Sequence, residues 1–242
     1  MNSGTPDAGL SLPAMDCTRD HVDLVRRLID AFRDRSARFV RHLHPDWIQA
    51  ALPGWAASLP RWCGRDNEGQ LSLLLAQTYE VQWPTLQVLS GRWHRLALMP
   101  RPVSTQALAF VSLYVHRAAI RRCVDKASRQ KLVNMVGAPA MAVLIRSVES
   151  DSRPVPQDLE ILQADQRVAE GFRLLHRTGH WSCKRSSKLL RLTLPKDMPE
   201  PKDPAGPLVS AQELDGVFDL LSDCFPEQSW LFGSDMDRAL SV

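Results

Sequence analysis

Apolar side chains recur every three or four positions along most of the chain, and this spacing predicts amphipathic helices. The first predicted helix begins after Thr18, a typical N-cap residue, and runs for about 25 residues. It ends at Pro45, because a proline pushes the residue before it out of the helical region. Its apolar face consists of Val22, Val25, Leu28, Ile29, Phe32, Phe39, Val40 and Leu43.

The most apolar stretch, residues 107–120, predicts a buried central helix with Ser104 or Thr105 as its cap. Gly137 stands where a glycine that ends a helix is expected. Pro139 suits the first turn of the helix that follows. The middle of the chain therefore predicts several helices in succession.

One stretch leaves two structures open. Leu190, Leu192 and Leu194 alternate with polar residues, which fits either a short strand or the end of a helix. Elsewhere the pattern is helical, and prolines and tryptophans gather in connections such as residues 81–103. The sequence thus predicts an all-α protein, a single compact domain with irregular connections and at most one short strand.

Composition divides the chain into four segments. Residues 1–17 are rich in glycine, serine and proline and are expected to form a disordered tail. Residues 18–195 are expected to form a helical core. Residues 196–209 resemble a proline-rich linker. Residues 210–242 begin with a helix capping box and are expected to form an acidic helix followed by an aromatic closing segment.

The net charge of +3 conceals a strong asymmetry. Residues 1–196 hold 28 basic and 17 acidic residues, a balance of 28 − 17 = +11, whereas residues 197–242 hold 2 and 10, a balance of 2 − 10 = −8. This split indicates either docking of the acidic end on the body or two different partner surfaces. A basic body also fits a nucleic-acid-binding regulator, although the arginines are spread along helices and not interleaved with aromatic residues.

The location expected from the sequence is the cytoplasm. The N-terminus lacks the basic and apolar regions of a secretory signal. Residues 107–120 are too short to span a bilayer and include charge. Five widely spaced cysteines without a CxxC pair indicate reduced thiols.

The stretch HLHPDWIQAALPGW raises the question of a metal site, because it contains His42 and His44. No third ligand stands nearby at a recognised spacing, so capping or packing is the expected role of both histidines. Asp46 is a candidate cap for the next short helix. Trp47 and Trp55 flank that helix, and we expect them to anchor it to the core.

A second metal-like spacing joins His176, His180 and Cys183. On a helix the two histidines would share a face, but Gly179 interrupts the helix between them and no HExxH motif is present. A metal-dependent enzyme built on these three residues is therefore the least favoured alternative.

Signatures of catalysis are missing from the sequence. It contains no GxSxG nucleophile motif and no glycine-rich phosphate loop. Asp215 and Asp219 are four residues apart, but on the polar face of an amphipathic helix, where solvent exposure is expected. We therefore expect a protein that is not an enzyme and needs no cofactor.

Four stretches resemble a bacterial protein family in the same order. They are HPDW, LALMPRPVSTQALAFVSLYVHRAAIRRCVDKASRQKLVNMVG, GFRLL followed by SSKLLRLTLPK, and FPEQSWLF. The family is that of the SctK (YscK-like) sorting-platform adaptors of type III secretion injectisomes, and the chain looks closest to its plant-pathogen branch. The resemblance covers roughly residues 20–235 and rests on order and spacing, since each stretch alone is short.

The resemblance implies a mostly helical cytoplasmic adaptor, peripheral at the inner membrane. Such a protein bridges the cytoplasmic domain of the inner-membrane ring protein to the platform protein that scaffolds the export ATPase complex. Neither nucleic acid nor membrane insertion is implied. The residues that match the family's structural elements are His44, Pro45, Trp47, Gly137, Leu192, Leu194 and Pro195, with Trp230, Leu231 and Phe232 in its closing aromatic cluster. The proline-rich stretch of residues 195–207 departs from the family pattern.

Two sets of residues are candidates for contact with partners. Arginines on two helix faces either meet acidic partner surfaces or are simply exposed to solvent. These are Arg26, Arg33 and Arg41 on the first face and Arg117, Arg121 and Arg122 on the second. The closing trio Trp230, Leu231 and Phe232 forms either a core plug or a peptide-like hook.

Overall fold

The computed structural model describes residues 14–54, 65–123, 125–146, 164–198 and 209–232, and every regular element in these ranges is a helix. The all-α prediction is confirmed, and residues 190–194 form a helix end and a turn rather than a strand. In chain order the helices are α1 (Ala14–Ala37), α2 (Phe39–His42), α3 (Pro45–Ala51), α5 (Arg65–Thr78), α6 (Leu86–Ser90), η1 (Arg92–Leu98), α7 (Arg101–Val115), α8 (Arg117–Arg122), α9 (Lys126–Val136), α10 (Ala138–Arg146), α11 (Ala164–Arg177), α12 (Lys184–Arg191), α13 (Ala211–Cys224), η2 (Pro226–Gln228) and α14 (Ser229–Phe232).

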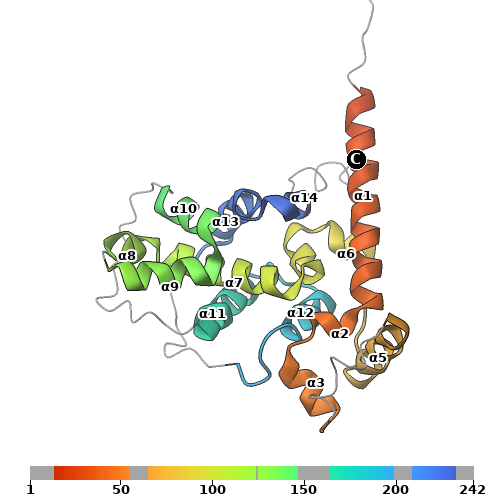
Figure 1. Cartoon of the computed structure of the whole chain (residues 1–242). Coiled ribbons are helices and arrows are strands. Elements are labelled where there is room, and N and C mark those ends of the chain that lie inside the picture. Colours follow the sequence, from red (N-terminus) through yellow and green to blue (C-terminus); the bar gives the residue numbers. More distant parts are fainter. Residues whose placement is uncertain (1–13, 55–64, 124, 147–163, 199–208, 233–242) are drawn as a thin grey trace, which may run out of the picture.

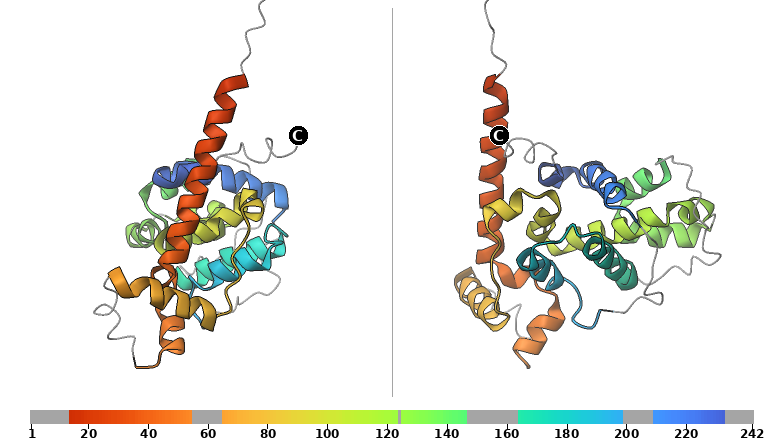
Figure 2. Two further views of the ribbon diagram at one scale, coloured as in Figure 1. Left: turned by 90° about the vertical axis from the view of Figure 1, so that its right-hand side faces the viewer. Right: turned by 180° about the vertical axis from the view of Figure 1, so that it is seen from behind.

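Helix α1 stands along one side of the molecule, and its first half extends beyond the body (Figures 1 and 2). It begins at Ala14, four residues before the predicted cap at Thr18. It also ends earlier than predicted, at Ala37, because the chain bends at Arg38 (φ −118°, ψ 33°) before α2. The bend directs Phe39 into an apolar cluster, where it is fully buried.

Helix α7 forms the spine of the molecule, as its apolar composition predicts. Every residue from Ala107 to Val115 is buried. Helix α11 crosses α7 so closely that a Cβ atom added at Gly171 would lie 1.9 Å from the carbonyl oxygen of Leu108. The glycine permits this backbone approach, which a larger residue would prevent.

One apolar cluster extends through the whole body. It includes Leu28 on α1, the buried face of α7, and Leu132 and Val136 on α9. Helices α8 and α9 lie at the end of the molecule opposite α1 (Figures 1 and 2). A continuous packed core therefore connects α1 to α8 and α9. Because packed cores are rigid, we expect the distance between these two ends of the molecule to be fixed.

The acidic C-terminal helix α13 docks on the basic body, which answers the question that the charge asymmetry raised. Its fully buried residues are Leu214, Val217, Phe218 and Leu221. On its polar side, Asp215 accepts a hydrogen bond from Trp93 Nε1 at 3.3 Å, and Asp219 pairs with Arg92. Part of the acidic charge is thus used inside the molecule.

Gly137 ends α9 with φ at +88°, a conformation that favours glycine, so the predicted C-cap is confirmed. Its N–H donates to the Val133 carbonyl at 2.8 Å. Helix α10 begins at the next residue, Ala138, and Pro139 lies in its first turn, as predicted.

Candidate partner-binding surfaces

The corner that contains His42, His44 and Trp47 joins two distant parts of the chain. His44, and not Asp46, caps α3, because His44 Nδ1 accepts the Asp46 N–H at 3.3 Å and Pro45 takes the first helical position. The backbone N–H of His44 donates to the carbonyl of Leu192 at 2.9 Å. His44 therefore has one of the two roles expected for it, and the prediction of Asp46 as the cap is wrong.

His42 is a packing residue, as predicted, but its partner was not foreseen. This partner is Arg35 on α1, which is only 1% exposed. It donates to His42 Nδ1 at 2.8 Å and to the carbonyls of Met99 at 2.9 Å and Leu189 at 3.3 Å. Burial lowers the pKa of Arg35 to about 9, and burial together with the Arg35 charge lowers the pKa of His42 to about 3. The histidine is thus a neutral acceptor at neutral pH.

Trp47 fixes the corner to the segment after α12. Its Nε1 donates to the carbonyl of Leu194 at 2.9 Å, and the Arg191 guanidinium lies 5.2 Å from its ring centre. Arg191 also donates to the carbonyl of Pro195 at 2.6 Å. Trp47 of the HPDW stretch therefore contacts the segment around Leu194, although the two lie far apart in the sequence. Trp55, the second predicted anchor, lies outside the described residues.

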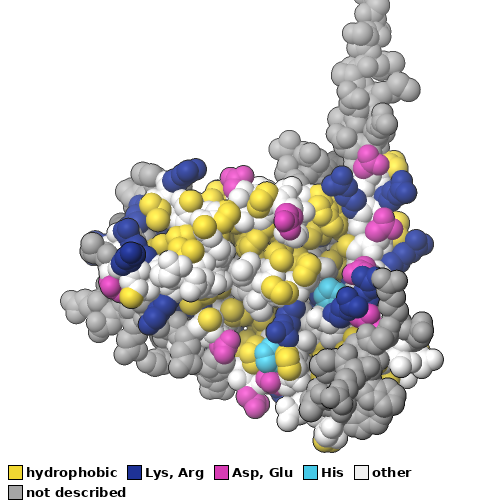
Figure 3. All heavy atoms as spheres, viewed as in Figure 1, with side chains coloured by type: hydrophobic (Ala, Val, Ile, Leu, Met, Phe, Trp, Pro, Cys, Tyr) yellow, Lys and Arg dark blue, Asp and Glu magenta, His cyan; other side chains and the backbone are white. Residues whose placement is uncertain are grey.

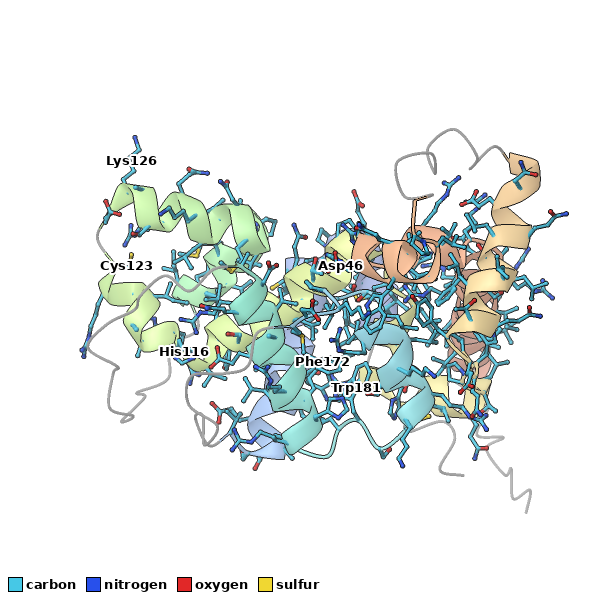
Figure 4. The ribbon with its side chains drawn as sticks, turned by 90° about the horizontal axis from the view of Figure 1, so that it is seen from below. Asp46, His116, Cys123, Lys126, Phe172 and Trp181 are labelled. Atoms are coloured by element: carbon cyan, nitrogen blue, oxygen red, sulfur yellow. The ribbon has the colours of Figure 1, made fainter. Side chains whose placement is uncertain are left out.

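This junction forms one side of a groove of about 760 Å³ between α11, α12 and the turn after α5. Two of its aromatic residues, Phe172 and Trp181, lie side by side with ring centres 6.2 Å apart (Figure 4). The groove is lined by Trp47, Thr78, Tyr79, Glu80, Phe172, His176, Trp181, Ser182, Lys184, Ser187, Lys188, Arg191 and Leu192.

The turn after α5 supplies a neighbouring wall of the groove. Glu80 adopts φ at +46°, and the N–H of Val81 donates back to the carbonyl of Ala76 at 2.8 Å, which closes the end of the helix. This turn places Tyr79 against Trp47, with ring centres 5.5 Å apart at nearly a right angle. Lys188 Nζ on α12 donates to the carbonyl of Glu80 in this turn at 3.2 Å.

Helix α12 presents a basic face that the sequence analysis did not single out. Lys184, Arg185, Lys188 and Arg191 are the charged residues of this eight-residue helix, and none of its residues is acidic. The signal was present in the sequence KRSSKLLR, where the serines and leucines at helical spacing are the buried residues. The alternation of Leu190, Leu192 and Leu194 also fits a strand, and this made the helical pattern of KRSSKLLR harder to recognise.

The arginines predicted on the first helix differ in their surroundings. Arg26 and Arg33 are exposed on α1. Arg41 instead pairs with the buried carboxylate of Glu68, so its charge is partly used inside the molecule. The exposed aspartates of α1 stand between its arginines and give this surface mixed charge (Figure 3). They are Asp23, Asp30 and Asp34.

The second predicted basic face requires a correction at Arg117. This residue is only 3% exposed, because its guanidinium stacks 4.3 Å from the centre of the Tyr114 ring and lies 3.6 Å from Glu213 on the docked α13. Arg121 is half-buried, whereas Arg122 is exposed. Further exposed basic residues continue this face on α9, namely Lys126, Arg129 and Lys131. In Figure 3 basic side chains gather mainly toward the two ends of the molecule.

His176, His180 and Cys183, whose spacing suggested a metal site, contact different partners. His176 Nε2 lies 2.8 Å from Ser187 Oγ, and burial lowers the pKa of this histidine. His180 Nε2 lies 3.1 Å from Asp215, and Cys183 is the N-cap residue of α12. Within the described ranges, no three histidine, cysteine, aspartate or glutamate side chains gather as they would around a metal ion.

The closing trio is largely buried. Leu231 and Phe232 are 2% and 3% exposed, and Trp230 is half-buried. The buried Arg95 donates from Nη1 to the Leu231 carbonyl at 3.1 Å. Phe232 packs edge-on against Phe218 at 5.3 Å. This burial favours the core plug over the hook.

Comparison with known protein families shows which family the chain resembles. Residues 20–227 match the family described as bacterial type III secretion protein (HrpB4). No curated protein and no solved structure matches the chain. Among the described residues, none of the helices combines the length and apolarity needed to cross a membrane.

Proposed function

The chain belongs to the HrpB4 family of bacterial type III secretion proteins, and from this premise we propose that it is a non-enzymatic adaptor of the injectisome. It bridges the cytoplasmic domain of the inner-membrane ring protein to the scaffold protein of the cytoplasmic sorting platform. In this role it is a cytoplasmic protein held at the inner membrane through the secretion apparatus.

The observation that carries the proposal is the placement of two exposed charged surfaces, one of mixed charge on α1 and one basic on α8 and α9, at opposite ends of one core. One surface holds Arg26 and Arg33 on α1, and the other holds Arg122 and Lys126 on α8 and α9. Because one apolar cluster connects these ends, a partner bound at each end would be held at a fixed distance. A bridge needs this property, whereas a single binding site does not.

The charge pattern favours protein partners over nucleic acid. Basic and acidic side chains alternate along the exposed face of α1. A phosphate backbone would be repelled by the aspartates, whereas a protein surface can present both signs in register. The proposed partners therefore have acidic surfaces with some basic positions.

The test is light scattering on the purified full-length chain mixed with the two proposed partners from the same bacterium, singly and together. The expected result is a defined complex with each partner and a larger complex that contains all three proteins. Failure to form the ternary complex at micromolar concentrations, or competition between the two partners for the chain, would contradict the bridging role.

A further inference from the structure

We propose that the groove between α11, α12 and the turn after α5 receives an acidic segment of a partner protein that carries a bulky apolar side chain. The inference rests on the proposed function, since the segment belongs to a protein of the secretion apparatus. It adds a third contact surface, distinct from the basic surfaces at the two ends of the molecule.

The lining of the groove favours an apolar anchor. Trp47, Tyr79, Phe172 and Trp181 come from three separate parts of the chain and meet around one hollow of about 760 Å³. This volume is in the range of sites that bury a side chain or a small ligand, roughly 300–1,000 Å³. Aromatic walls of this kind bury the apolar part of a peptide and contribute much of its binding energy.

The charge of the groove favours an acidic segment around that anchor. Its lining includes three basic side chains, Lys184, Lys188 and Arg191, and one acidic side chain, Glu80, a balance of 3 − 1 = +2. Burial lowers the pKa of His176, so this histidine adds no positive charge at neutral pH. Complementary charge steers an acidic segment to the groove and sets its orientation.

The rim of the groove is accessible on the side of α12. Lys184 and Lys188 are exposed, and the neighbouring Arg185 extends the same basic face. Acidic side chains near the groove are few. Burial lowers the pKa of Arg191, the charge of Asp197 opposes this effect, and the charge of Arg173 adds to it. A carboxylate from a partner would therefore meet mainly positive charge along α12.

The groove is formed before any partner binds, because internal contacts hold its walls. Trp47 Nε1 is fixed by the Leu194 carbonyl, and the Ser187 hydroxyl lies 2.8 Å from His176 Nε2. Lys188 Nζ is held 3.2 Å from the Glu80 carbonyl. A preformed groove reduces the ordering that binding requires and suits an extended segment that becomes ordered on binding.

The first experiment identifies the occupant in bacteria with an active secretion apparatus. A photoreactive benzoylphenylalanine replaces Lys184 in the full-length chain, and a second strain carries it at Lys126 on α9 as a control site. The expected result at position 184 is a cross-linked peptide of a secretion protein that has net negative charge and an aromatic or leucine residue. Cross-links at position 126 but not at 184, or a cross-linked peptide that is basic, would overturn the proposal.

The second experiment measures the contribution of the charge with that cross-linked peptide in synthetic form. The double variant K184E/K188E is expected to bind it at least about tenfold more weakly than the unchanged chain. The matched variant K184R/K188R keeps the charge and is expected to bind normally. Equal binding by the unchanged chain and K184E/K188E would overturn the charge argument. If the groove proposal is wrong but the adaptor role is right, the ternary complex still forms. If the adaptor role is wrong, the ternary complex does not form, so the two outcomes are distinguishable.

Discussion

At the scale of single residues, the close contact between the backbones of α11 and α7 depends on Gly171. The backbone of α7 fills the space that a side chain would need, with the carbonyl carbon of Leu108 2.7 Å from the position of a Cβ atom. The neighbour is backbone in the middle of a buried helix, so it cannot move aside as the end of a flexible side chain would.

Gly171→Ala is therefore expected to lower the free energy of unfolding by about 3 kcal/mol or more, or to prevent folding. Urea denaturation followed by circular dichroism measures the effect. Gly216 on α13 supplies the control, since a Cβ atom there meets nothing within 4 Å. Gly216→Ala is expected to be neutral or to stabilise the protein by about 0.5–1 kcal/mol. Equal stability of both variants would contradict the steric argument.

Next to this contact, Glu170 is the centre of a partly buried network between α7 and α11. It accepts hydrogen bonds from the Ser112 hydroxyl, from His116 Nε2 at 2.9 Å and from Arg167 Nη1 at 2.9 Å. Burial by itself would raise the pKa of this carboxyl. The hydrogen bond and charge of His116, with Ser112 and Arg167, outweigh burial and lower the pKa to about 2.

A carboxyl whose pKa is lower in the folded than in the unfolded state stabilises the fold above its unfolded value of 4.5, and this stability is lost as pH falls through about 2. Glu170→Gln should therefore lower the free energy of unfolding at pH 7 by roughly 3 kcal/mol. The difference from the unchanged chain should shrink between pH 4.5 and pH 2. Denaturation series at pH 7, 4.5 and 3 test this, and a constant difference across the series would contradict it.

At the scale of elements, the helices were predictable because their apolar periodicity is local. The glycine at Gly137 and the buried α7 follow from neighbouring residues in the sequence, whereas the cap of α3 was predicted at Asp46 and lies at His44. The groove was not predictable, since its walls come from α3, α5, α11 and α12. The burial of Arg117 also depends on a distant element, because Glu213 belongs to α13.

The segment after α13 illustrates the same dependence on distant contacts. The sequence left a plug and a hook open, and the burial of Leu231 and Phe232 favours the plug. Removal of residues 226–242 eliminates two buried apolar side chains, each of which stabilises the fold by about 1.5–3 kcal/mol. It also deprives the buried Arg95 of one acceptor. We therefore expect this truncation to lose cooperative thermal unfolding.

A chain that ends at Phe232 is the control for this truncation, because it retains the two buried side chains and the Leu231 carbonyl. Comparing the melting curves of the two truncated proteins isolates the contribution of residues 226–232. If the shorter chain melted cooperatively at the temperature of the longer one, the closing segment would be a hook and not a plug.

At the scale of the whole molecule, the body presents exposed arginines at both ends, among aspartates on α1, while its acidic helix α13 is engaged internally. Asp219 on α13 is paired with Arg92, and Asp215 lies between Trp93 and His180. The negative charge of the C-terminal segment is therefore partly neutralised inside the protein. The exposed arginines and lysines at the two ends remain available to partners.

If each end binds a different partner, charge reversal at the two ends should have separate effects. Arg26→Glu with Arg33→Glu on α1 should weaken binding of one partner at least about tenfold and leave the other unchanged. Arg122→Glu with Lys126→Glu at the opposite end should show the reverse selectivity. Titration calorimetry of each variant with each partner, at two salt concentrations, measures both affinity and its electrostatic part.

Arginine-to-lysine and lysine-to-arginine versions of the same pairs keep the charge and control for changes in shape. All four altered residues are exposed, so the fold should be unaffected. If both reversals weakened the same partner, the two ends would form one continuous interface and not a bridge. If neither had an effect, the exposed arginines would be solvated surface, and binding would then depend on other parts of the molecule.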